Sequence, residues 1–375
     1  MKAEWQAKPF EGCIEKVTYT TKIQRKDFLD AGTFPVVSQE DAFINGHWDG
    51  EEDVFRVETP LVVFGDHTKV LKYVDFDFVL GADGVKLLLP KEFLVPKFFY
   101  YQLQTAKLES LGYARHYKLL KELDINYPNR TEQHRIVAIL DEAFDGIATA
   151  KANAEKNLQN ARALFESYLQ SVFTERGDGW VEKRLQDVCE KITDGTHQTP
   201  KYFDEGVVFL SSRNVTSGKI DWDNIKYIDT KQHLEMHKRV APRVGDILLA
   251  KNGTTGVAAI VDRDVVFDIY VSLALLRSLG EVQPQLLLYF INSPAAKHQF
   301  NKRLKGVGVP NLHLQEIREV VIGFPRDLNK QDEIVDQLDL LGTEVCRLES
   351  LYQQKLAALD DLKKSLLHQA FSGQL

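Results

Sequence analysis

The strongest constraint on this 375-residue chain is that it contains two copies of one plan. Trp5 near the start of the first copy matches Trp180 in the second, and QHRIV at 133–137 matches QDEIV at 331–335. The second offset persists along both tails, at Leu140/Leu338, Leu158/Leu356, Leu164/Leu362, Leu169/Leu367 and Phe173/Phe371. Copies of this kind share a fold and differ by loop insertions. The ends of the copies match while their centres have diverged, which predicts two related recognition surfaces.

Each copy ends in a long helix with a coiled-coil seam. In the second copy the seam steps by fours and threes through 334, 338, 341, 345, 348, 352, 355, 359, 362, 366 and 369, and only Lys355 and Gln369 are polar. In the first copy it runs through Ile136, Leu140, Ala143, Ile147, Ala150, Ala154, Ala161, Leu164 and Tyr168, with interruptions at Asn157 and Ser171. Asn157 and Lys355 are equivalent, and two interpretations stay open, a tolerated polar residue and a register-fixing one.

The length of these helices predicts that they pair with each other. A helix of roughly 40 residues spans about 60 Å, which is too long to be buried on one small domain. Because a globular segment precedes each helix, an antiparallel pair would give a pseudo-two-fold particle with one globular domain toward each end. We therefore predict a globular domain at 1–130, a central helix at 131–176, a second globular domain at 177–327, and a C-terminal helix at 328–375 that pairs with the central one.

The globular segments have the pattern of mixed α/β domains. Short β-rich runs such as VVFLSS and GDILLAK alternate with turn signals such as NGTTG. Gln283 to Phe300 is predicted to be helical with a break at Ser293-Pro294, and 95–107 is its counterpart. The predicted fold class is mixed α+β globular domains plus long antiparallel coiled-coil helices, in a two-fold pseudo-symmetric repeat.

Composition excludes several classes of protein. Charged residues make up 27% and hydrophobic residues 44% of the chain, which excludes disordered and collagen-like chains. The start, MKAEWQAKPF, has no apolar signal core, and no stretch approaches the roughly 18 apolar residues of a membrane helix. The three cysteines form no C-x-x-C pair, so we expect no disulfide framework and no thiolate zinc site, and because no paired His/Cys spacing occurs we expect no other metal site. We expect a protein of the reducing cytoplasm.

Sequence motifs for catalysis are absent. The chain has no P-loop, no dinucleotide-binding glycine signature, no N/D-P-P-Y/F methyltransferase run and no H-E-x-x-H. The net charge of −7 argues weakly against a nucleic-acid partner, although clusters such as Arg115, His116, Lys118 and Lys121 can form local positive patches or simply a solvated helix face. We therefore expect catalysis and cofactors to reside in other proteins.

Polar, glycine-bearing loops are the remaining candidates for function. TDGTHQTP at 193–200 combines small donors with an imidazole, and Ser211-Ser212-Arg213-Asn214 offers side chains suited to guanine and adenine edges. KNGTTG at 251–256 and GDHTK at 65–69 each follow an apolar strand. An ordinary turn explains any one of these loops. KNGTTG and GDHTK, however, recur at matched places in the two copies, so for these two loops a shared binding role is as well supported as an ordinary turn.

These motifs resemble those of one family, the DNA-specificity subunits of type I restriction-modification systems. The resemblance covers nearly the whole chain and rests on TDGTHQTP at 193–200, GDILLAKNGTTG at 245–256, VVFGDHTKVLKYVDFDFVLGADG at 62–84, GYARHYKLLKELDINYP at 112–128, EQHRIVAILDEAF at 132–144 and VPNLHLQEIREVVIGFP at 309–325. The first copy departs from the family pattern, because TYTTKIQRK at 18–26 stands where a DGTH-like loop would be.

The resemblance implies two target-recognition domains that read a bipartite site on double-stranded DNA, with the long helices setting the gap. It also implies that this chain is not an enzyme and holds no cofactor. Methyltransferase (modification) subunits would supply S-adenosylmethionine, and restriction (motor and nuclease) subunits would supply ATP with Mg²⁺. The expected DNA contacts are Thr20, Lys22, Ser38, Gln39, Gly65, Asp66, His67, Thr68, Arg115 and His116 in the first copy, and Thr193, Asp194, Gly195, Thr196, His197, Ser212, Arg213, Asn214, Lys251, Asn252 and Thr254 in the second.

Two other classes of protein compete with this interpretation. A coiled-coil scaffold without sequence-specific DNA binding is consistent with the net acidity, and it would bind protein partners independently of salt. A DNA-modifying enzyme complete in one chain would need a catalytic motif, which the sequence lacks. A methyl-transfer or cleavage assay on the purified chain separates the enzyme from the other two classes.

The proposed spacing role of the helices makes a geometric prediction. Inserting four residues into both helices at matched positions should lengthen the gap between half-sites by about 6 Å. That length corresponds to about two base pairs at about 3.4 Å each. Sequencing the randomised duplexes retained by each form of the protein measures the gap, and an unchanged gap contradicts the spacing role.

Overall fold

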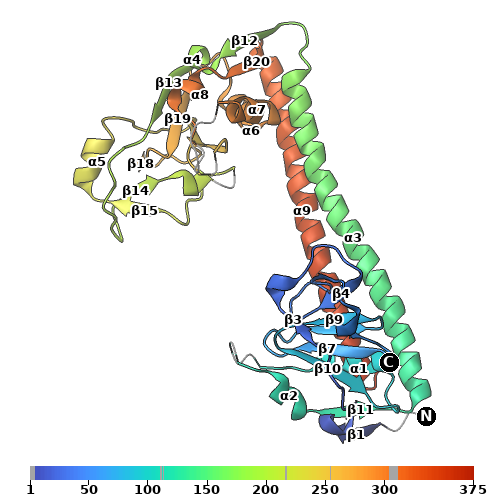
Figure 1. The fold of residues 1–375 in the computed structure, drawn as a ribbon. Coiled ribbons are helices and arrows are strands. Elements are labelled where there is room, and N and C mark those ends of the chain that lie inside the picture. The colour runs from blue at the N-terminus through green and yellow to red at the C-terminus, as the bar shows by residue number, and fades with distance from the viewer. Residues whose placement is uncertain (1–4, 110–111, 113, 216–217, 254, 304–310) are drawn as a thin grey trace. The chain divides into compact units, whose positions relative to one another are not determined.

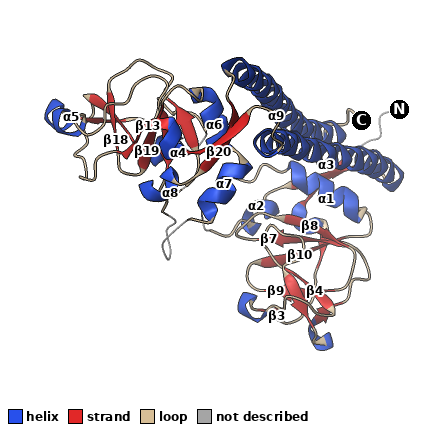
Figure 2. Cartoon of the chain, turned by 90° about the horizontal axis from the view of Figure 1, so that it is seen from above, coloured by secondary structure: helices blue, strands red, loops and turns tan. Residues whose placement is uncertain are grey.

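The computed structural model describes residues 5–109, 112, 114–215, 218–253, 255–303 and 311–375. The chain forms two compact units, one made of Met1–Glu155 with Gln353–Leu375 and the other of Lys156–Tyr352. Two long helices contribute to both units, α3 (Arg130–Thr174) and α9 (Leu328–Phe371), and Figures 1 and 2 show them running side by side.

The first unit contains two larger sheets and a small one. One sheet is antiparallel in the order β2 (Ile14–Glu15), β10 (Val85–Pro90), β7 (Leu61–Gly65), β8 (Leu71–Val74). The other has the order β3 (Lys22–Ile23), β9 (Phe78–Gly81), β4 (Phe34–Val37), β5 (Gly46–Trp48), and β6 (Val54–Phe55) also pairs with β9. β1 (Gln6–Pro9) pairs with β11 (Asp124–Tyr127). The short helices are α1 (Pro96–Thr105), α2 (Tyr117–Lys121) and the 3₁₀ turns Phe10–Gly12, Arg25–Asp27 and Glu51–Asp53.

The second unit repeats this plan. Its antiparallel sheet has the order β13 (Cys189–Asp194), β19 (Leu273–Ser278), β16 (Ile247–Ala250), β17 (Ala258–Ile260). A mixed sheet has the order β15 (Lys226–Ile228), β14 (Val207–Leu210), β18 (Phe267–Ile269), and β12 (Trp180–Arg184) pairs with β20 (Val321–Pro325). The helices are α4 (Leu185–Val188), α5 (Thr230–Met236), α6 (Pro284–Asn292), α7 (Pro294–Asn301), α8 (Leu314–Arg318) and the 3₁₀ turn Ser212–Val215.

The two units therefore share one topology, which confirms the predicted internal repeat and the predicted fold class. β7 is equivalent to β16, β10 to β19, and the parallel pair β4 and β9 to the parallel pair β14 and β18. The predicted helix over 283–300 is also confirmed, with its break, because α6 ends at Asn292 and α7 begins at Pro294. Equivalent strands place the loops after β7 and β16 at matching positions in the two units.

A glutamine joins each long helix to its globular core. Gln133 is buried at the start of α3, where its Oε1 accepts from Val95 N at 2.7 Å and its Nε2 donates to Phe93 O and Pro128 O at 3.0 and 2.9 Å. Gln331, equally buried in α9, repeats these contacts, and its partners are Gln283 N, Glu281 O and Pro325 O, each at 2.8 Å. Each amide satisfies three backbone groups, so it fixes the position of its helix on the core.

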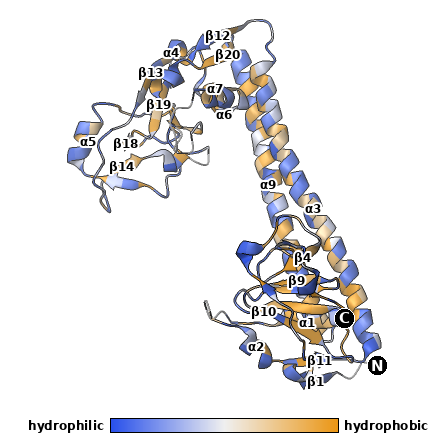
Figure 3. Cartoon of the chain, in the orientation of Figure 1, coloured by the Kyte–Doolittle hydropathy of each residue, from blue (hydrophilic) through white to orange (hydrophobic). Residues whose placement is uncertain are grey.

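Apolar contacts lock the ends of both helices to the cores. Leu140 and Leu367 belong to the core of the first unit, and the equivalent Leu338 and Leu169 belong to the core of the second. Figure 3 shows the apolar residues gathered on the central strands of the units. A tyrosine adds a polar contact in each unit, since Tyr101 donates to Asp141 and Tyr289 donates to Asp339. Burial, together with the neighbouring carboxylate, raises the pKa of both phenols.

Side-chain pairs show that the two helices are antiparallel. In the second unit Arg162 of α3 contacts Glu349 of α9 at 2.6 Å, while Tyr168, further along α3, donates to Gln337, which precedes Glu349. In the first unit Lys151 contacts Asp360 at 2.7 Å. Exposed ion pairs contribute at most about 1 kcal/mol each, so apolar contacts provide most of the stability of the pair.

The predicted seam is wrong at one equivalent pair of leucines. Leu164 is 61% exposed and Leu362 is 47% exposed, whereas Leu169 and Leu367 are buried in their place. A straight helix drifts by about 20° per heptad relative to a strict seven-residue repeat, so the buried face leaves the predicted seam after a few heptads. Asn157 and Lys355 are exposed, which favours the interpretation as tolerated polar residues.

The glutamine joint makes a stability prediction. Gln133→Ala leaves three buried backbone groups without partners, so it should lower the free energy of unfolding by about 2 kcal/mol or more, and Gln331→Ala should do the same. Gln159→Ala, at an exposed position of α3, is the matched control and should change stability by less than about 0.5 kcal/mol. Urea denaturation measures all three, and equal effects of Gln133→Ala and Gln159→Ala would contradict the joint.

Candidate nucleic-acid interface

Three loops of the second unit converge on the turn between β18 and β19. Thr196 N donates to Ile269 O at 3.0 Å, and Val271 N donates back to Thr196 O at 2.9 Å. Ser212 N donates to the hydroxyl of Ser272 at 3.0 Å, and Lys251 N donates to the carbonyl of Ser272 at 3.0 Å. Residues predicted as DNA contacts from three separate stretches of sequence are thus brought together at one place.

A buried carboxylate organises the cations of this cluster. Asp194 is 3% exposed, and its carboxylate lies 2.5 Å from Arg239 Nη2, 3.1 Å from Lys251 Nζ and 3.3 Å from His197 Nε2. Arg239 Nε also donates to the carbonyls of Asp194 and Gly195 at 3.1 Å. Burial favours a higher pKa for Asp194, but the hydrogen bonds from Arg239 and Lys251 outweigh burial, and its pKa lies below the ordinary value.

Gly195 is required by a close backbone approach. A Cβ atom at this position would lie 1.9 Å from Ile269 O, which belongs to the backbone of β18 and cannot move aside. Only glycine lets the 193–198 segment lie against that strand. The glycine of the DGTH motif therefore supports the loop and brings no side chain to a ligand.

The cluster contains both exposed side chains and buried side chains that hold the loops in place. The side chain of His197 is 63% exposed and that of Arg239 46% exposed, and Arg213 is also exposed. Thr193, Ser212 and Asn252 are half-buried, whereas Lys251 and Thr196 are buried. Thr254 lies outside the described residues. The exposed polar surface of the cluster therefore consists chiefly of His197, Arg213 and Arg239.

The side chain of Asn214 is not available for the base contact predicted from the sequence. Its side chain is buried, with Oδ1 accepting from Ser211 N at 2.9 Å and Nδ2 donating to Asp221 O and Asn224 O at 3.3 and 3.1 Å. Since its amide is fully used in closing a turn, it has no group to offer an adenine edge. Arg239, which was not predicted from the sequence, instead contributes a guanidinium on a side chain that is 46% exposed. Only its contact with a residue 45 positions earlier identifies it, and local sequence carries no such signal.

The loop after β7 forms the matching cluster in the first unit. His67 N donates to Gln39 Oε1 at 3.1 Å, and Thr68 Oγ1 donates to Gln39 O at 2.6 Å. Asp66 is buried, and its backbone and carboxylate accept from His116 N and Tyr117 N, each at 2.7 Å. Predicted contacts from three distant stretches again meet. Here too a buried aspartate lies beneath the more exposed His67 and Thr68.

The other predicted DNA contacts of the first unit also divide into buried residues and exposed ones. A Cβ atom on Gly65 would lie 2.2 Å from Thr68 Oγ1, so this glycine allows the turn to close. Ser38 and His116 are buried, and Ser38 donates to Asn45 Oδ1 at 2.9 Å, so neither presents its side chain to the surface. Arg115 is exposed.

Thr20 and Lys22 lie on the segment that replaces a DGTH-like loop. Lys22 Nζ donates to Val85 O at 3.1 Å and lies over the ring of Tyr19. Its pKa is lowered, first by burial and then by the charge of Lys86. Thr20 Oγ1 is buried, without a hydrogen-bond partner among the described residues.

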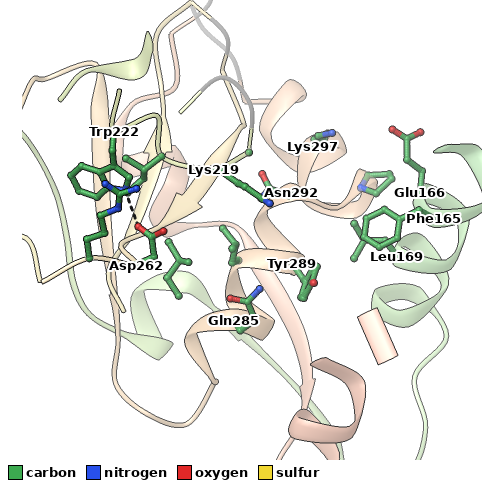
Figure 4. A pocket seen from close by; sticks show the side chains of 16 residues that line it. Phe165, Glu166, Leu169, Lys219, Trp222, Asp262, Gln285, Tyr289, Asn292 and Lys297 are labelled. Carbon is green, nitrogen blue, oxygen red and sulfur yellow. Dashed lines mark hydrogen bonds between the residues drawn. The ribbon is translucent and has the colours of Figure 1, made fainter. Parts of the chain in front are cut away.

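In the second unit, a pocket of about 550 Å³ lies between α3 and α6. Figure 4 shows Phe165, Glu166 and Leu169 of α3 on one side and Trp222 with Asp262 on the other. The indole of Trp222 donates to Asp262 at 2.9 Å. Phe165 packs against the core of this unit, so the pocket is a hollow beside the helix.

A potential metal-binding group also occurs near the second cluster. His233 and His237 approach the carboxylate of Asp268 at 2.7 and 3.0 Å. The sequence predicts no metal site, because it contains no cysteine pair and no local metal-binding motif. His233 lies on α5, His237 is the residue that follows α5, and Asp268 lies on β18, about 30 residues further along the chain.

Comparison with known proteins identifies the family of the chain. The model of the type I restriction modification DNA specificity domain matches twice, at residues 3–159 and 177–357. Together these matches span most of the chain. The chain belongs to this family. The two matches correspond to the two copies described above.

Curated relatives of this specificity family are moderately similar to the chain. It is 22% identical over 286 residues to the Escherichia coli type I restriction enzyme EcoBI specificity subunit, with 69% of this chain and 60% of the relative covered. It is 21% identical to the MjaVIII specificity subunit of Methanocaldococcus jannaschii, covering 69% and 63%, and 26% identical to the E. coli EcoR124I/EcoR124II specificity subunit, covering 62% and 60%. The chain spans about three fifths of the length of these relatives.

Solved structures show the same fold. A chain from a structure described as the basis of complex assembly and conformational transition of the type I R-M system matches with a TM-score of 0.76, at 20% identity and 100% coverage of both chains. The HsdS subunit from Thermoanaerobacter tengcongensis matches with a TM-score of 0.56, at 20% identity, covering 99% of this chain and 97% of that one. Among the described helices of this family member, none is long and apolar enough to cross a membrane.

The charge cluster around Asp194 predicts how the stability of the chain depends on pH. Because the folded-state pKa of Asp194 lies below its ordinary value, ionised Asp194 stabilises the fold at neutral pH, and this stabilisation is lost as the pH falls below about 4. Asp194→Asn should therefore lower the free energy of unfolding at pH 7 by about 3 kcal/mol. It should also reduce the loss of stability on acidification.

Chemical denaturation at several pH values measures this effect. Asp204→Asn, at an exposed position of the same unit, is the matched control and should leave stability nearly unchanged. If Asp194→Asn has the same stability as the parent protein at pH 7, the role assigned to the cluster is wrong.

Proposed function

We propose that this chain is the DNA-specificity subunit of a type I restriction-modification complex and recognises a bipartite site on double-stranded DNA. The observation that carries the proposal is the pair of loop clusters at equivalent places of two repeated units. Residues 1–130 and 177–327 act as the two target-recognition domains. Each domain reads one half-site, and the long helices set the spacing between them.

The charge of the second cluster supports DNA as the ligand. The carboxylate of Asp194 holds the cations Arg239 and Lys251, so the cluster carries excess positive charge, and exposed Arg213 adds to it. Guanidinium groups bind phosphates and the guanine edge, and an imidazole can hydrogen-bond to bases. Buried Lys251 serves as support in this proposal, while His197, Arg213 and Arg239 contact the DNA.

The first cluster is proposed to read the other half-site with different chemistry. His67 and Thr68 lie at the loop tip, Gln39 fixes them, and exposed Arg115 follows in a second stretch. Hydroxyl and imidazole groups suit polar base edges, and the arginine suits phosphate. Different side chains on a shared frame are consistent with two unlike half-sites.

The chain is proposed to be non-catalytic and to act through partner subunits in the cytoplasm. Methyltransferase subunits would bring S-adenosylmethionine, and restriction subunits would bring ATP with Mg²⁺. The exposed and equivalent Leu164 and Leu362 support protein contacts on the helices, since apolar side chains on a helix surface are typical of interfaces. The acidic character of the chain also suits protein partners on surfaces away from the loops.

A binding selection tests the proposal directly. Randomised duplex DNA is retained by the chain co-expressed with its modification subunit at two salt concentrations, and the retained pool is sequenced. We expect a split motif with a fixed gap. Binding that shows no sequence preference and is abolished uniformly by salt would contradict the proposal, because phosphate contacts alone give that result.

Single substitutions should affect one half-site each. Arg213→Ala should relax the preference at one half-site by about tenfold, the size of one lost base contact, and His67→Ala should relax the other half-site. Arg347→Ala and His134→Ala, both exposed on the long helices, are the charge-matched controls and should leave both half-sites unchanged. Loss of both half-sites from Arg213→Ala alone would contradict the assignment of one reader to each unit.

A further inference from the structure

Two imidazoles and one carboxylate converge in the second unit, between α5 and β18. His233 Nδ1 lies 2.7 Å from Asp268 Oδ2, and His237 Nδ1 lies 3.0 Å from Asp268 Oδ1. The ring centroids of the two histidines are 4.7 Å apart. One potential ligand atom from each of the three residues lies within 4.8 Å of the others.

Local sequence explains why the two imidazoles share one face. Asp229 caps α5 by accepting from Gln232 N at 2.8 Å, which starts the helix just before the histidines. His233 and His237 are four residues apart, and this spacing places both side chains on the same side of a helix. β18 passes on that side and carries Asp268, which no short sequence motif links to the histidines.

The carboxylate of Asp268 is buried beside two imidazoles. Asp268 is 1% exposed, and among the described residues the side chains within hydrogen-bonding distance of its carboxylate are those of His233 and His237. Moving a carboxylate out of water is costly, so a bound cation would stabilise this arrangement.

We propose that His233, His237 and Asp268 bind one divalent transition-metal ion, with Zn²⁺ as the best match. Two nitrogens and one carboxylate oxygen suit Zn²⁺, whereas Ca²⁺ and Mg²⁺ prefer oxygen ligands alone. Ligand atoms bound at about 2.1 Å in a tetrahedral site lie about 3.4 Å apart, so small side-chain movements suffice. Water would occupy the fourth position.

The metal site connects directly to the proposed DNA-reading cluster. Arg239 follows His237 by two residues, and its backbone N donates to Met236 O at the end of α5. Ile269 follows Asp268, and its carbonyl accepts from Thr196 N. A metal that joins α5 to β18 therefore fixes both Arg239 and the 193–198 loop. This consequence rests on the proposed function, whereas the metal site does not.

Metal titration of the full chain tests the site. The protein carries Cys346→Ser to remove its exposed thiol, is stripped with a chelator, and is titrated with Zn²⁺ against a chromophoric competitor. We expect one tight site per chain. His233→Ala, His237→Ala and Asp268→Asn should each weaken binding by more than about 100-fold, since even outer-sphere partners are worth 10 to 100-fold. His298→Ala, at an exposed position of α7, is the control and should bind like the parent.

A second measurement needs none of these substitutions, in case a variant fails to fold. Co²⁺ added to the metal-free chain should give the visible absorption of a four-coordinate nitrogen and oxygen site, and Zn²⁺ should abolish it. Zn²⁺ should also raise the melting temperature of the chain. Absence of tight binding by the parent chain, or binding unchanged in the three variants, would overturn the site and leave the two imidazoles as plain hydrogen-bond donors to Asp268.

DNA binding by the metal-free and Zn²⁺-loaded chains, each in complex with the modification subunit, separates the two proposals. Tighter sequence-selective binding by the loaded complex supports the connection to the reading cluster. Failure of DNA binding by the loaded complex overturns the proposed function and leaves the metal site in place. Failure of metal binding overturns the site regardless of any DNA result.

Discussion

The structure depends on a single hydrogen-bonding arrangement that occurs twice, the buried glutamine at the start of each long helix. Gln133 and Gln331 each bind one backbone N–H and two carbonyls of the preceding globular segment. An amide so enclosed has one orientation that satisfies all its partners, and any rotation or sliding of the helix leaves polar groups buried without partners. The apolar contacts of Leu140 and Leu338 stabilise the cores, but they tolerate small shifts that the amides do not.

A similar division of roles applies in the two loop clusters. Asp66 and Asp194 are buried, and each fixes a loop whose exposed side chains face solvent. In the second cluster the buried carboxylate of Asp194 pairs with Arg239 and Lys251. The carboxylate therefore holds these two cations in place. The exposed groups are thereby held in place before any ligand arrives, which lowers the ordering cost of binding.

Sequence alone predicts the repeat, the long helices and the fold class, because these depend on periodicities and on matches at fixed offsets. Sequence alone does not predict features that depend on small deviations summed along a helix, or on contacts between residues far apart in the sequence. Leu164 and Leu362 leave the seam because a straight helix departs gradually from a seven-residue repeat. Asn214 closes a turn, and Arg239 reaches a carboxylate far away in sequence, so neither role is visible in a local motif. The predicted DNA contacts remain a prediction, although the structure gathers many of them into two clusters.

The separation of buried support from exposed side chains in these loops has an evolutionary consequence. Substitutions at Gly195 or Asp194 disturb a backbone approach and a buried charge network, so selection for stability should hold them constant. The exposed side chains of His197 and Arg213 are less constrained by packing than these buried positions. Surface substitutions of this kind usually alter stability little. Under the proposed function, a lineage can therefore sample new target preferences one residue at a time without first acquiring compensating mutations elsewhere in the fold.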